Sequence, residues 1–201
     1  MESRLRGADE PGLKLIETML WDGSGVALES LHRARLLAGA QALGWSCPAF
    51  VLKGPAHPAR LRLTLDAGGT VALESGPLSP MKDVWRLALS RERLTSTDPW
   101  LRVKSTRRAA YDRARAELPE GIDEVILLNE RGEVCDGSIS TLFFDRGNGL
   151  RTPPLSAGLL PGVLRASLAV PEETLLPGDL PLVRLWIGNA LRGFCPARWV
   201  G

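Results

Sequence analysis

The stretch "LRTPPLSAGLLPGVLRASLA", residues 150–169, joins a loop rich in proline and glycine to an apolar helical pattern that begins at about Val163. A glycine directly before a helix leaves backbone N–H groups exposed at the positive end of the helix dipole, where proteins often bind anions. The stretch therefore predicts an anion site at Gly162 and Val163.

Composition limits what kind of protein can carry this loop. The chain has 201 residues, of which 44% are apolar, enough for one large or two small globular domains. Its 25 basic and 23 acidic residues leave a formal net charge of +2. No global field therefore favours nucleic acid or an anionic membrane, and we expect a small-molecule partner.

Targeting and redox signals are also informative. The N-terminus has no apolar signal core, and no run of about 18 apolar residues occurs, so the chain is expected to be cytoplasmic and neither exported nor membrane-spanning. Cys47, Cys135 and Cys195 are odd in number and show no CxxC spacing, which argues against a disulfide framework or a zinc site. No metal is expected.

The first half of the chain changes its hydrophobic period. The pattern predicts a helix from an N-cap at Ser30 to a stop at Gly44, followed by a β-hairpin over residues 61–73 that turns at two glycines. Strand-like alternation continues over residues 85–89. The polar stretch at residues 91–100 then reads as a linker.

This linker predicts an N-terminal α/β domain over residues 1–92 and a C-terminal domain over residues 93–201. In the second domain, "STRRAAYDRARAEL" predicts a helix with Tyr111, Ala114 and Leu118 on one face. The segments "DEVILLNERGEV" and "STLFFDRGNGLRT" read as strands, and the loop of residues 150–162 leads into a last helix. The expected class is α+β in two parts.

The sequence lacks the motifs of several common enzyme classes. There is no GxxxxGK[ST], GxGxxG or GxSxG motif, and neither His32 nor His57 stands in a recognisable triad. The basic run "RVKSTRRAAYDRAR" is interleaved with acidic residues, and Arg113 with Glu117 has the i,i+4 spacing of a surface pair. We interpret the run as a solvated helix face and expect no nucleic-acid binding.

Lys104 has a distinctive position. It follows the apolar, strand-like "WLRV" and precedes a helix that Ser105 or Thr106 could cap. Burial and a helix N-terminus both disfavour the ammonium form, and a neutral lysine is what Schiff-base chemistry requires. A surface lysine is the alternative interpretation.

Five stretches occur in the order and spacing of a known family: "LIETMLWDGSGVALESLHRARL", "VKSTRRAAYDRARAE", "VILLNERGEVCDGSISTLFF", "LRTPPLSAGLLPGVLR" and "IGNALRG". They run from Leu15 to Gly193. The chain thus resembles the fold-type IV pyridoxal-phosphate enzymes, the class IV aminotransferase family, and within it the 4-amino-4-deoxychorismate lyases. The resemblance implies a small N-terminal domain, a larger C-terminal domain around a barrel-like sheet, the cofactor between them, and a homodimer.

The resemblance also implies the role of each site residue. The anion becomes the phosphate of pyridoxal 5'-phosphate, bound at Gly162 and Val163. Lys104 matches the lysine that bonds covalently to the cofactor and later moves protons at the reacting carbon. Arg35 matches the arginine that binds the cofactor phosphate, and on a helical wheel it shares a face with small apolar neighbours at Leu31, Ala38 and Ala42.

Two cofactor positions depart from the family pattern. Asp136 stands where the family usually has a glutamate facing the pyridine nitrogen, and its side chain is shorter by roughly 1.5 Å. Thr141 replaces the usual asparagine of the "sN(I/L)F" pattern. The "YGDG"-like stretch that precedes the family's ET pair is absent, but Glu17 and Thr18 remain, and Thr18 matches a threonine that assists at the substrate in the lyases.

Three functions are compatible with this resemblance. A lyase would eliminate pyruvate from 4-amino-4-deoxychorismate and release 4-aminobenzoate, a folate precursor. An aminotransferase would pass an amino group from a branched-chain or D-amino acid to a 2-oxo acid. A cofactor-binding protein that has lost catalysis is the third, because the N-terminus is short and residue 136 is an aspartate. Both enzymes would use the same residues, and the similarity of "KSTRRAAYDRAR" and "TPPLSAGLLPGVLR" to the lyase branch favours the lyase.

Overall fold

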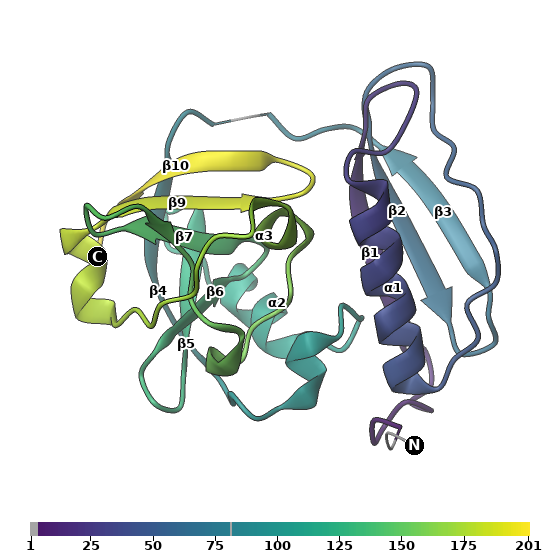
Figure 1. The fold of residues 1–201 in the computed structure, drawn as a ribbon, viewed down its shortest axis with the longest axis horizontal. Coiled ribbons are helices and arrows are strands. Elements are labelled where there is room, and N and C mark those ends of the chain that lie inside the picture. The colour runs from purple at the N-terminus through teal and green to yellow at the C-terminus, as the bar shows by residue number, and fades with distance from the viewer. Residues whose placement is uncertain (1–3, 81) are drawn as a thin grey trace. The chain divides into compact units, whose positions relative to one another are not determined.

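A computed structural model describes residues 4–80 and 82–201 and divides them into two compact units (Figure 1). Unit 1 contains residues 4–80 and Arg102–Arg107, and unit 2 contains residues 82–101 and 108–201. The division falls at residue 80 and not at the expected residue 92, because the strand over residues 85–94 pairs within the sheet of unit 2.

Unit 1 is a three-stranded antiparallel sheet with one helix. The strands β1 (Lys14–Trp21), β2 (Ala59–Asp66) and β3 (Val71–Gly76) lie in the order β1-β2-β3. The predicted hairpin is confirmed as β2 and β3. Its turn is stabilised by the Asp66 carboxylate, which accepts hydrogen bonds from the backbone N–H groups of Gly68 and Thr70.

The helix α1 (Glu29–Leu43) ends where the sequence predicts, with Gly44 in the left-handed conformation. Its N-cap is Leu28 at φ 56°, not Ser30. The buried face also differs from the predicted Leu31–Ala38–Ala42 stripe, because α1 packs on β1 through a different set of residues: His32, Leu36, Gly39, Ala40 and Leu43. At Gly39 an added Cβ would lie 3.1 Å from Leu15, so the helix approaches the strand closely.

Residues 102–107 belong to unit 1 because they pair with β1. The backbone N–H of Ile16 donates to the carbonyl oxygen of Lys104 at 2.9 Å, and the N–H of Thr106 donates to the carbonyl of Lys14 at 2.8 Å. Between these bonds, Leu15 and Ser105 form an antiparallel bridge. The segment thus extends one edge of the unit 1 sheet.

Unit 2 is built on a curled seven-stranded sheet in the order β6-β5-β4-β10-β9-β7-β8 (Figure 1). Its strands are β4 (Trp85–Leu94), β5 (Glu124–Asn129), β6 (Val134–Gly137), β7 (Thr141–Asp145), β8 (Leu150–Arg151), β9 (Arg184–Asn189) and β10 (Gly193–Trp199). β4 lies parallel to both β5 and β10, whereas the remaining neighbours are antiparallel.

Successive residues of β5 face opposite sides of this sheet and divide its core in two. Ile126 and Leu128 belong to one apolar cluster, with Phe144 and Leu180 among its members. Val125 and Leu127 belong to another, together with buried residues from the end of β4, from residues 99–116, from β6 and from the segment after β8: Leu94, Leu101, Ala114, Cys135, Ala157 and Leu159. Both faces of the sheet are therefore covered.

The segments between the strands of unit 2 contain short helices. The α-helices are α2 (Ala109–Ala116) and α3 (Val163–Leu168), and the 3₁₀ helices are η1 (Pro99–Arg102), η2 (Leu155–Ala157) and η3 (Pro177–Leu182).

The prediction of a strand over "WLRV" was wrong, because residues 100–102 lie in the 3₁₀ helix η1. The helix after Lys104 begins at Ala109, so Ser105 and Thr106 do not cap it. Arg113 pairs with Glu92 at 2.7 Å and not with Glu117.

Three features of the described residues bear on membrane, metal and disulfide partners. Within residues 4–80 and 82–201, no helix is both long and apolar enough to cross a membrane. Over the same ranges, no group of three or more His, Cys, Asp and Glu side chains could hold a metal ion. Cys47, Cys135 and Cys195 are free thiols.

Candidate functional site

Unit 1 contains a buried charge cluster around Glu17. The Arg35 guanidinium donates from Nε to Oε1 of Glu17 at 2.8 Å and from Nη2 to Oε2 at 2.6 Å, while Nδ1 of His32 lies 2.6 Å from Oε2. Glu17 and His32 are each 2% exposed. Burial raises the pKa of Glu17, but the hydrogen bonds from His32 and Arg35 outweigh burial, so this pKa lies below its usual range.

Local sequence spacing produces this cluster. His32 and Arg35 are three residues apart and so lie on one side of α1. Leu15, Glu17 and Met19 alternate along β1 on the face that α1 covers, and all three are buried. His32 had no evident partner in the sequence. In the structure its Nδ1 contacts Oε2 of Glu17, and its buried Nε2 has no hydrogen-bond partner among the described residues.

The backbone of Lys104 is hydrogen-bonded to the same strand, β1. Its carbonyl oxygen accepts from the N–H of Ile16, which is the residue next to Glu17 on β1. Lys104 and Arg35 are 69 positions apart in sequence, yet adjacent residues of β1 hold both. The predicted effect of a helix N-terminus on the Lys104 amine is wrong, because α2 starts four residues after Ser105. Thr18, half-buried on β1, follows Glu17 directly.

In unit 2, Asp136 and Thr141 lie at the two ends of the tight turn of residues 137–140. Asp136 lies near the end of β6 and is 5% exposed, and Thr141 begins β7 and is equally buried. The N–H of Gly137 donates to the carbonyl of Ser140 at 2.7 Å, which closes the turn between them. The two predicted cofactor residues therefore occupy defined positions at its two ends.

Tyr111 of α2 lies close enough to Asp136 for the charge of the aspartate to act on its hydroxyl. Its hydroxyl oxygen is buried and has no hydrogen-bond partner among the described residues. Burial, followed by the nearby charge of Asp136, raises the pKa of Tyr111, so the phenol remains a protonated donor. The sequence placed Tyr111 only on the apolar face of a helix, and nothing in the pattern distinguished it from a core residue.

The predicted anion loop leads into α3 at Val163, as the sequence indicates, and Gly162 is the N-cap residue. An added Cβ on Gly162 would lie 2.7 Å from Oγ1 of Thr141. Thr141 pairs with Gly188 across β7 and β9, and a Cβ on Gly188 would lie 2.5 Å from Leu164 of α3. A Cβ on Gly188 would also lie 2.4 Å from the carbonyl oxygen of Gly193, so only glycine fits there, whereas a side chain at Gly162 would displace the Thr141 hydroxyl. The sequence missed Gly188, although it lies in the quoted "IGNALRG" stretch.

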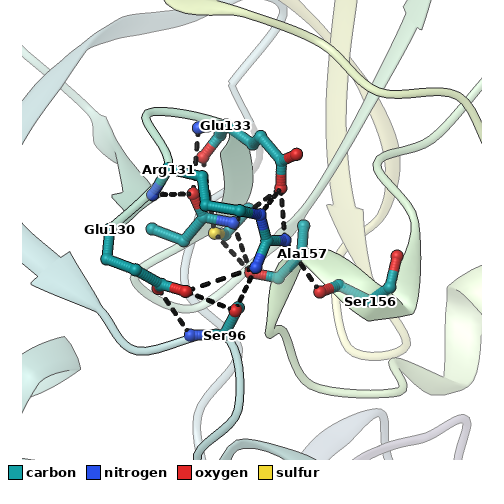
Figure 2. A network of polar contacts seen from close by, with 8 residues as sticks. Ser96, Glu130, Arg131, Glu133, Ser156 and Ala157 are labelled. Carbon is teal, nitrogen blue, oxygen red and sulfur yellow. Dashed lines mark hydrogen bonds and ion pairs between the residues drawn. The ribbon is translucent and has the colours of Figure 1, made fainter.

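A polar network fixes the loop before Gly162 (Figure 2). Arg131, in the turn between β5 and β6, donates to the carbonyl oxygen of Ser156 at 3.1 Å and to the hydroxyl of Ser96. Glu130 accepts from the backbone N–H of Ser96 at 2.7 Å. The network therefore joins three chain segments that are far apart in sequence.

The same loop is anchored from the core side. The Asn129 side chain donates to the carbonyl of Ala157 at 3.0 Å, and the thiol of Cys135 donates to that carbonyl at 3.2 Å. Gly158 adopts φ 86°, and a Cβ there would lie 2.5 Å from Cα of Ser96. The loop is thus held in one conformation by hydrogen bonds and close backbone packing.

The predicted residues fall into two groups. Unit 1 holds Lys104, Arg35 and Thr18 on or against β1. Unit 2 brings Thr141, Gly162 and Val163 together at the start of α3 and places Asp136 at the other end of the β6–β7 turn. Unit 1 thus offers a guanidinium and an amine, and unit 2 offers a buried carboxylate and a glycine-bounded loop; each of these is a type of group that can bind part of a phosphorylated pyridine aldehyde.

Comparison with known proteins identifies the family of this chain. The family model of amino-transferase class IV matches residues 14–200. A Schizosaccharomyces pombe protein named "Putative aminodeoxychorismate lyase" is 32% identical over 168 residues, which cover 77% of this chain and 72% of the relative. A Thermotoga maritima protein named "Probable branched-chain-amino-acid aminotransferase" is 36% identical over 92 residues, which cover 45% of this chain and 33% of that protein.

Solved structures share the fold. A "Putative amino-acid aminotransferase" of Mesorhizobium loti superposes with a TM-score of 0.88 at 40% identity and covers 94% of this chain and 100% of the other. The 4-amino-4-deoxychorismate lyase of Pseudomonas aeruginosa superposes with a TM-score of 0.77 at 22% identity, covering 99% of this chain and 88% of that chain. At that identity the second match shows the fold alone. The expected α+β fold of the fold-type IV enzymes is confirmed, and the predicted barrel-like sheet is the curled sheet of unit 2.

Proposed function

Because the chain belongs to the class IV aminotransferase family, we propose that it binds pyridoxal 5'-phosphate and acts on a substrate that carries a primary amine. The observation that carries this proposal is the shared attachment of Lys104 and Arg35 to β1. Ile16 binds the backbone of Lys104 and Glu17 binds the side chain of Arg35, so two consecutive residues position both groups.

The proposal assigns a role to each site residue. Arg35, with the backbone of Gly162 and Val163 and the hydroxyl of Thr141, would hold the phosphate group. Asp136 would accept a hydrogen bond from the pyridine nitrogen and keep it protonated. The close approach of Gly162 to Thr141 supports this assignment, because a side chain at Gly162 would fill the space beside the hydroxyl.

The cofactor, when bound, withdraws electrons from the substrate carbon that bears the amine. Lys104 would then remove the proton from that carbon and return it elsewhere, which requires its amine to be neutral during part of the cycle. Thr18, next to Glu17, would assist on the substrate side.

For the reaction itself we propose elimination of pyruvate from 4-amino-4-deoxychorismate to give 4-aminobenzoate. Lys104 would remove the proton from the ring carbon that bears the amine, and the C–O bond on the neighbouring ring carbon would break. The enolpyruvate that leaves would take up a proton to become pyruvate, and the ring would become aromatic. The relative named for this lyase, at 32% identity over most of both chains, supports the choice.

An aminotransferase is the second candidate, supported by the 40% identical structure that carries an aminotransferase name. In that reaction Lys104 would move a proton between the substrate carbon and the cofactor, and the amino group would pass to a 2-oxo acid. The residues are the same, so substrate use must separate the two reactions.

The deciding experiment offers 4-amino-4-deoxychorismate as the only substrate. A lyase restores the aldehyde form of the cofactor at each turnover, so we expect stoichiometric pyruvate and 4-aminobenzoate with the visible spectrum unchanged at the end. Branched-chain and D-amino acids without an oxo acid should convert little of the cofactor. Rapid loss of the visible band with such an amino acid, and no pyruvate from aminodeoxychorismate, would establish the aminotransferase instead.

Thr18→Ala is an internal check on the lyase. It should slow pyruvate release while leaving cofactor binding intact, because Thr18 is assigned to the substrate side.

We further propose that the protein is a homodimer in the cytoplasm, in line with the family resemblance. Light scattering of the purified protein would measure its molecular mass and so test the dimer.

A further inference from the structure

Glu124 is a carboxylate that the proposed reaction does not use. It is the first residue of β5 and is 0% exposed. A carboxylate at such a depth costs free energy unless donors surround it. Four of the donors come from one short turn: the N–H of Ser138 at 3.1 Å and its hydroxyl, the N–H of Ile139 at 3.2 Å, and the hydroxyl of Ser140 at 2.8 Å. The N–H of Val125, the next residue of β5, also donates at 3.1 Å. The turn of residues 137–140 is therefore wrapped around this side chain.

The outward side of the same turn is fixed as well. Three of its carbonyl oxygens each accept a hydrogen bond. The Ser138 carbonyl accepts from the Arg108 side chain at 3.0 Å, the Ile139 carbonyl from the Asn189 side chain at 3.0 Å, and the Ser140 carbonyl from the N–H of Gly137 at 2.7 Å. Donors from the N-cap residue of α2 and from the end of β9 thus bind the turn as well. Little freedom remains for the turn to shift.

Steric contacts show how closely the turn fits. A Cβ on Gly137 would lie 2.4 Å from the hydroxyl oxygen of Ser140 and 3.0 Å from Oε2 of Glu124. Only glycine can bring the chain so close to the carboxylate. Arg115 of α2 lies 3.6 Å from Oε1 and offsets part of the charge.

We propose that Glu124 is a positioning residue for the cofactor site, which fixes Asp136 and Thr141 through the turn that joins them. Asp136 directly precedes Gly137, and Thr141 directly follows Ser140. A change in the turn must therefore move one or both residues. The inference rests on the proposed function, because it assigns Asp136 to the pyridine nitrogen and Thr141 to the phosphate.

Asp123 offers a matched control. It is the residue before Glu124, and its side chain is 4% exposed. Its carboxylate accepts hydrogen bonds from Arg86, near the start of β4, and from Lys82, which precedes β4. Loss of its charge should affect stability but not the turn. The pair of variants Glu124→Gln and Asp123→Asn therefore separates positioning of the site from general stabilisation.

The test uses apoprotein and 4'-deoxypyridoxine 5'-phosphate, which has the ring and phosphate of the cofactor but no aldehyde to react with Lys104. Its affinity is measured by calorimetry at a temperature at which circular dichroism shows every variant folded. We expect Glu124→Gln to bind the probe about tenfold more weakly or worse, since hydrogen bonds to a charged group are lost. Asp123→Asn should bind within about twofold of the unmodified protein.

The outcomes are distinct. Unchanged affinity in Glu124→Gln, or an equal loss in Asp123→Asn, would overturn the positioning role while the proposed function stands. Failure of the unmodified protein to bind the probe would overturn both. If Glu124→Gln does not fold, the double variant Ser138→Ala, Ser140→Ala removes two donors and decides the question in the same way: weaker binding supports the role and unchanged binding refutes it.

Discussion

Arg35 and Glu17 form two parallel hydrogen bonds, from Nε to Oε1 at 2.8 Å and from Nη2 to Oε2 at 2.6 Å. This fork fixes the plane of the guanidinium and hence the directions of its other N–H groups. An arginine carries five such donors, and Glu17 takes two. The strand residue therefore orients the arginine that we assign to the phosphate.

Reduction with borohydride should identify the reactive lysine. If Lys104 bonds to the cofactor, reduction fixes the cofactor to the peptide that contains it, and mass spectrometry locates the label. Lys104→Ala should lose both label and turnover. A label on Lys14, Lys53 or Lys82 would refute the assignment.

Removal of the guanidinium should weaken cofactor binding. For Arg35→Ala we expect a loss of about 2 to 5 kcal/mol in the binding free energy of pyridoxal 5'-phosphate, with secondary structure retained. Arg33→Ala is the control, because Arg33 lies on the same helix but pairs with the half-exposed Glu29. Equal affinity in both variants would show that Arg35 does not bind the phosphate.

The lowered pKa of Glu17 predicts a pH dependence of stability. Because the folded state favours the carboxylate, this side chain stabilises the fold above the unfolded pKa of about 4.3, and the contribution is lost as pH falls through the folded value. Glu17→Gln should cost about 3 kcal/mol at pH 7, since it breaks a buried pair.

Urea unfolding at several pH values would measure this difference, which should narrow below about pH 4. Glu29→Gln, which breaks the exposed pair with Arg33, should cost at most about 0.5 kcal/mol at any pH. A gap for Glu17→Gln that stays constant down to pH 3 would contradict the role of its charge.

The role assigned to Asp136 is electrostatic. Asp136→Asn should therefore reduce turnover more than Asp136→Glu, which keeps the charge and restores the residue usual in the family. Steady-state kinetics of the three forms, each saturated with cofactor, provide the comparison. Similar turnover in all three would mean that residue 136 does not act on the pyridine nitrogen.

Local signals in the sequence predicted several elements well. Gly44 stops α1, the glycines at 68 and 69 turn the β2–β3 hairpin, and the Gly162–Val163 pair starts α3. Each of these depends on backbone conformations or periodicities within a few residues. That is why a single sequence was sufficient.

The pairing of strands that are far apart in sequence could not be predicted in this way. Nothing near Trp85 indicates that β4 lies parallel to β5 and β10, and so the expected boundary at residue 92 differs from the division at residue 80. The partners of buried charges were equally hidden, as Glu124 shows. For the Glu17 cluster one signal was available, the i,i+3 spacing of His32 and Arg35 on a helix.

The return of residues 102–107 to β1 also restricts how such a chain can evolve. Residues 4–80 do not form a transferable module, because their sheet edge is completed by a segment encoded beyond β4. If recombination exchanged the first 80 residues for those of a distant relative, the recipient's own segment around Lys104 would have to pair with a foreign β1. Compatible crossovers must therefore preserve the match between Leu15 and Ser105, or lie after residue 107.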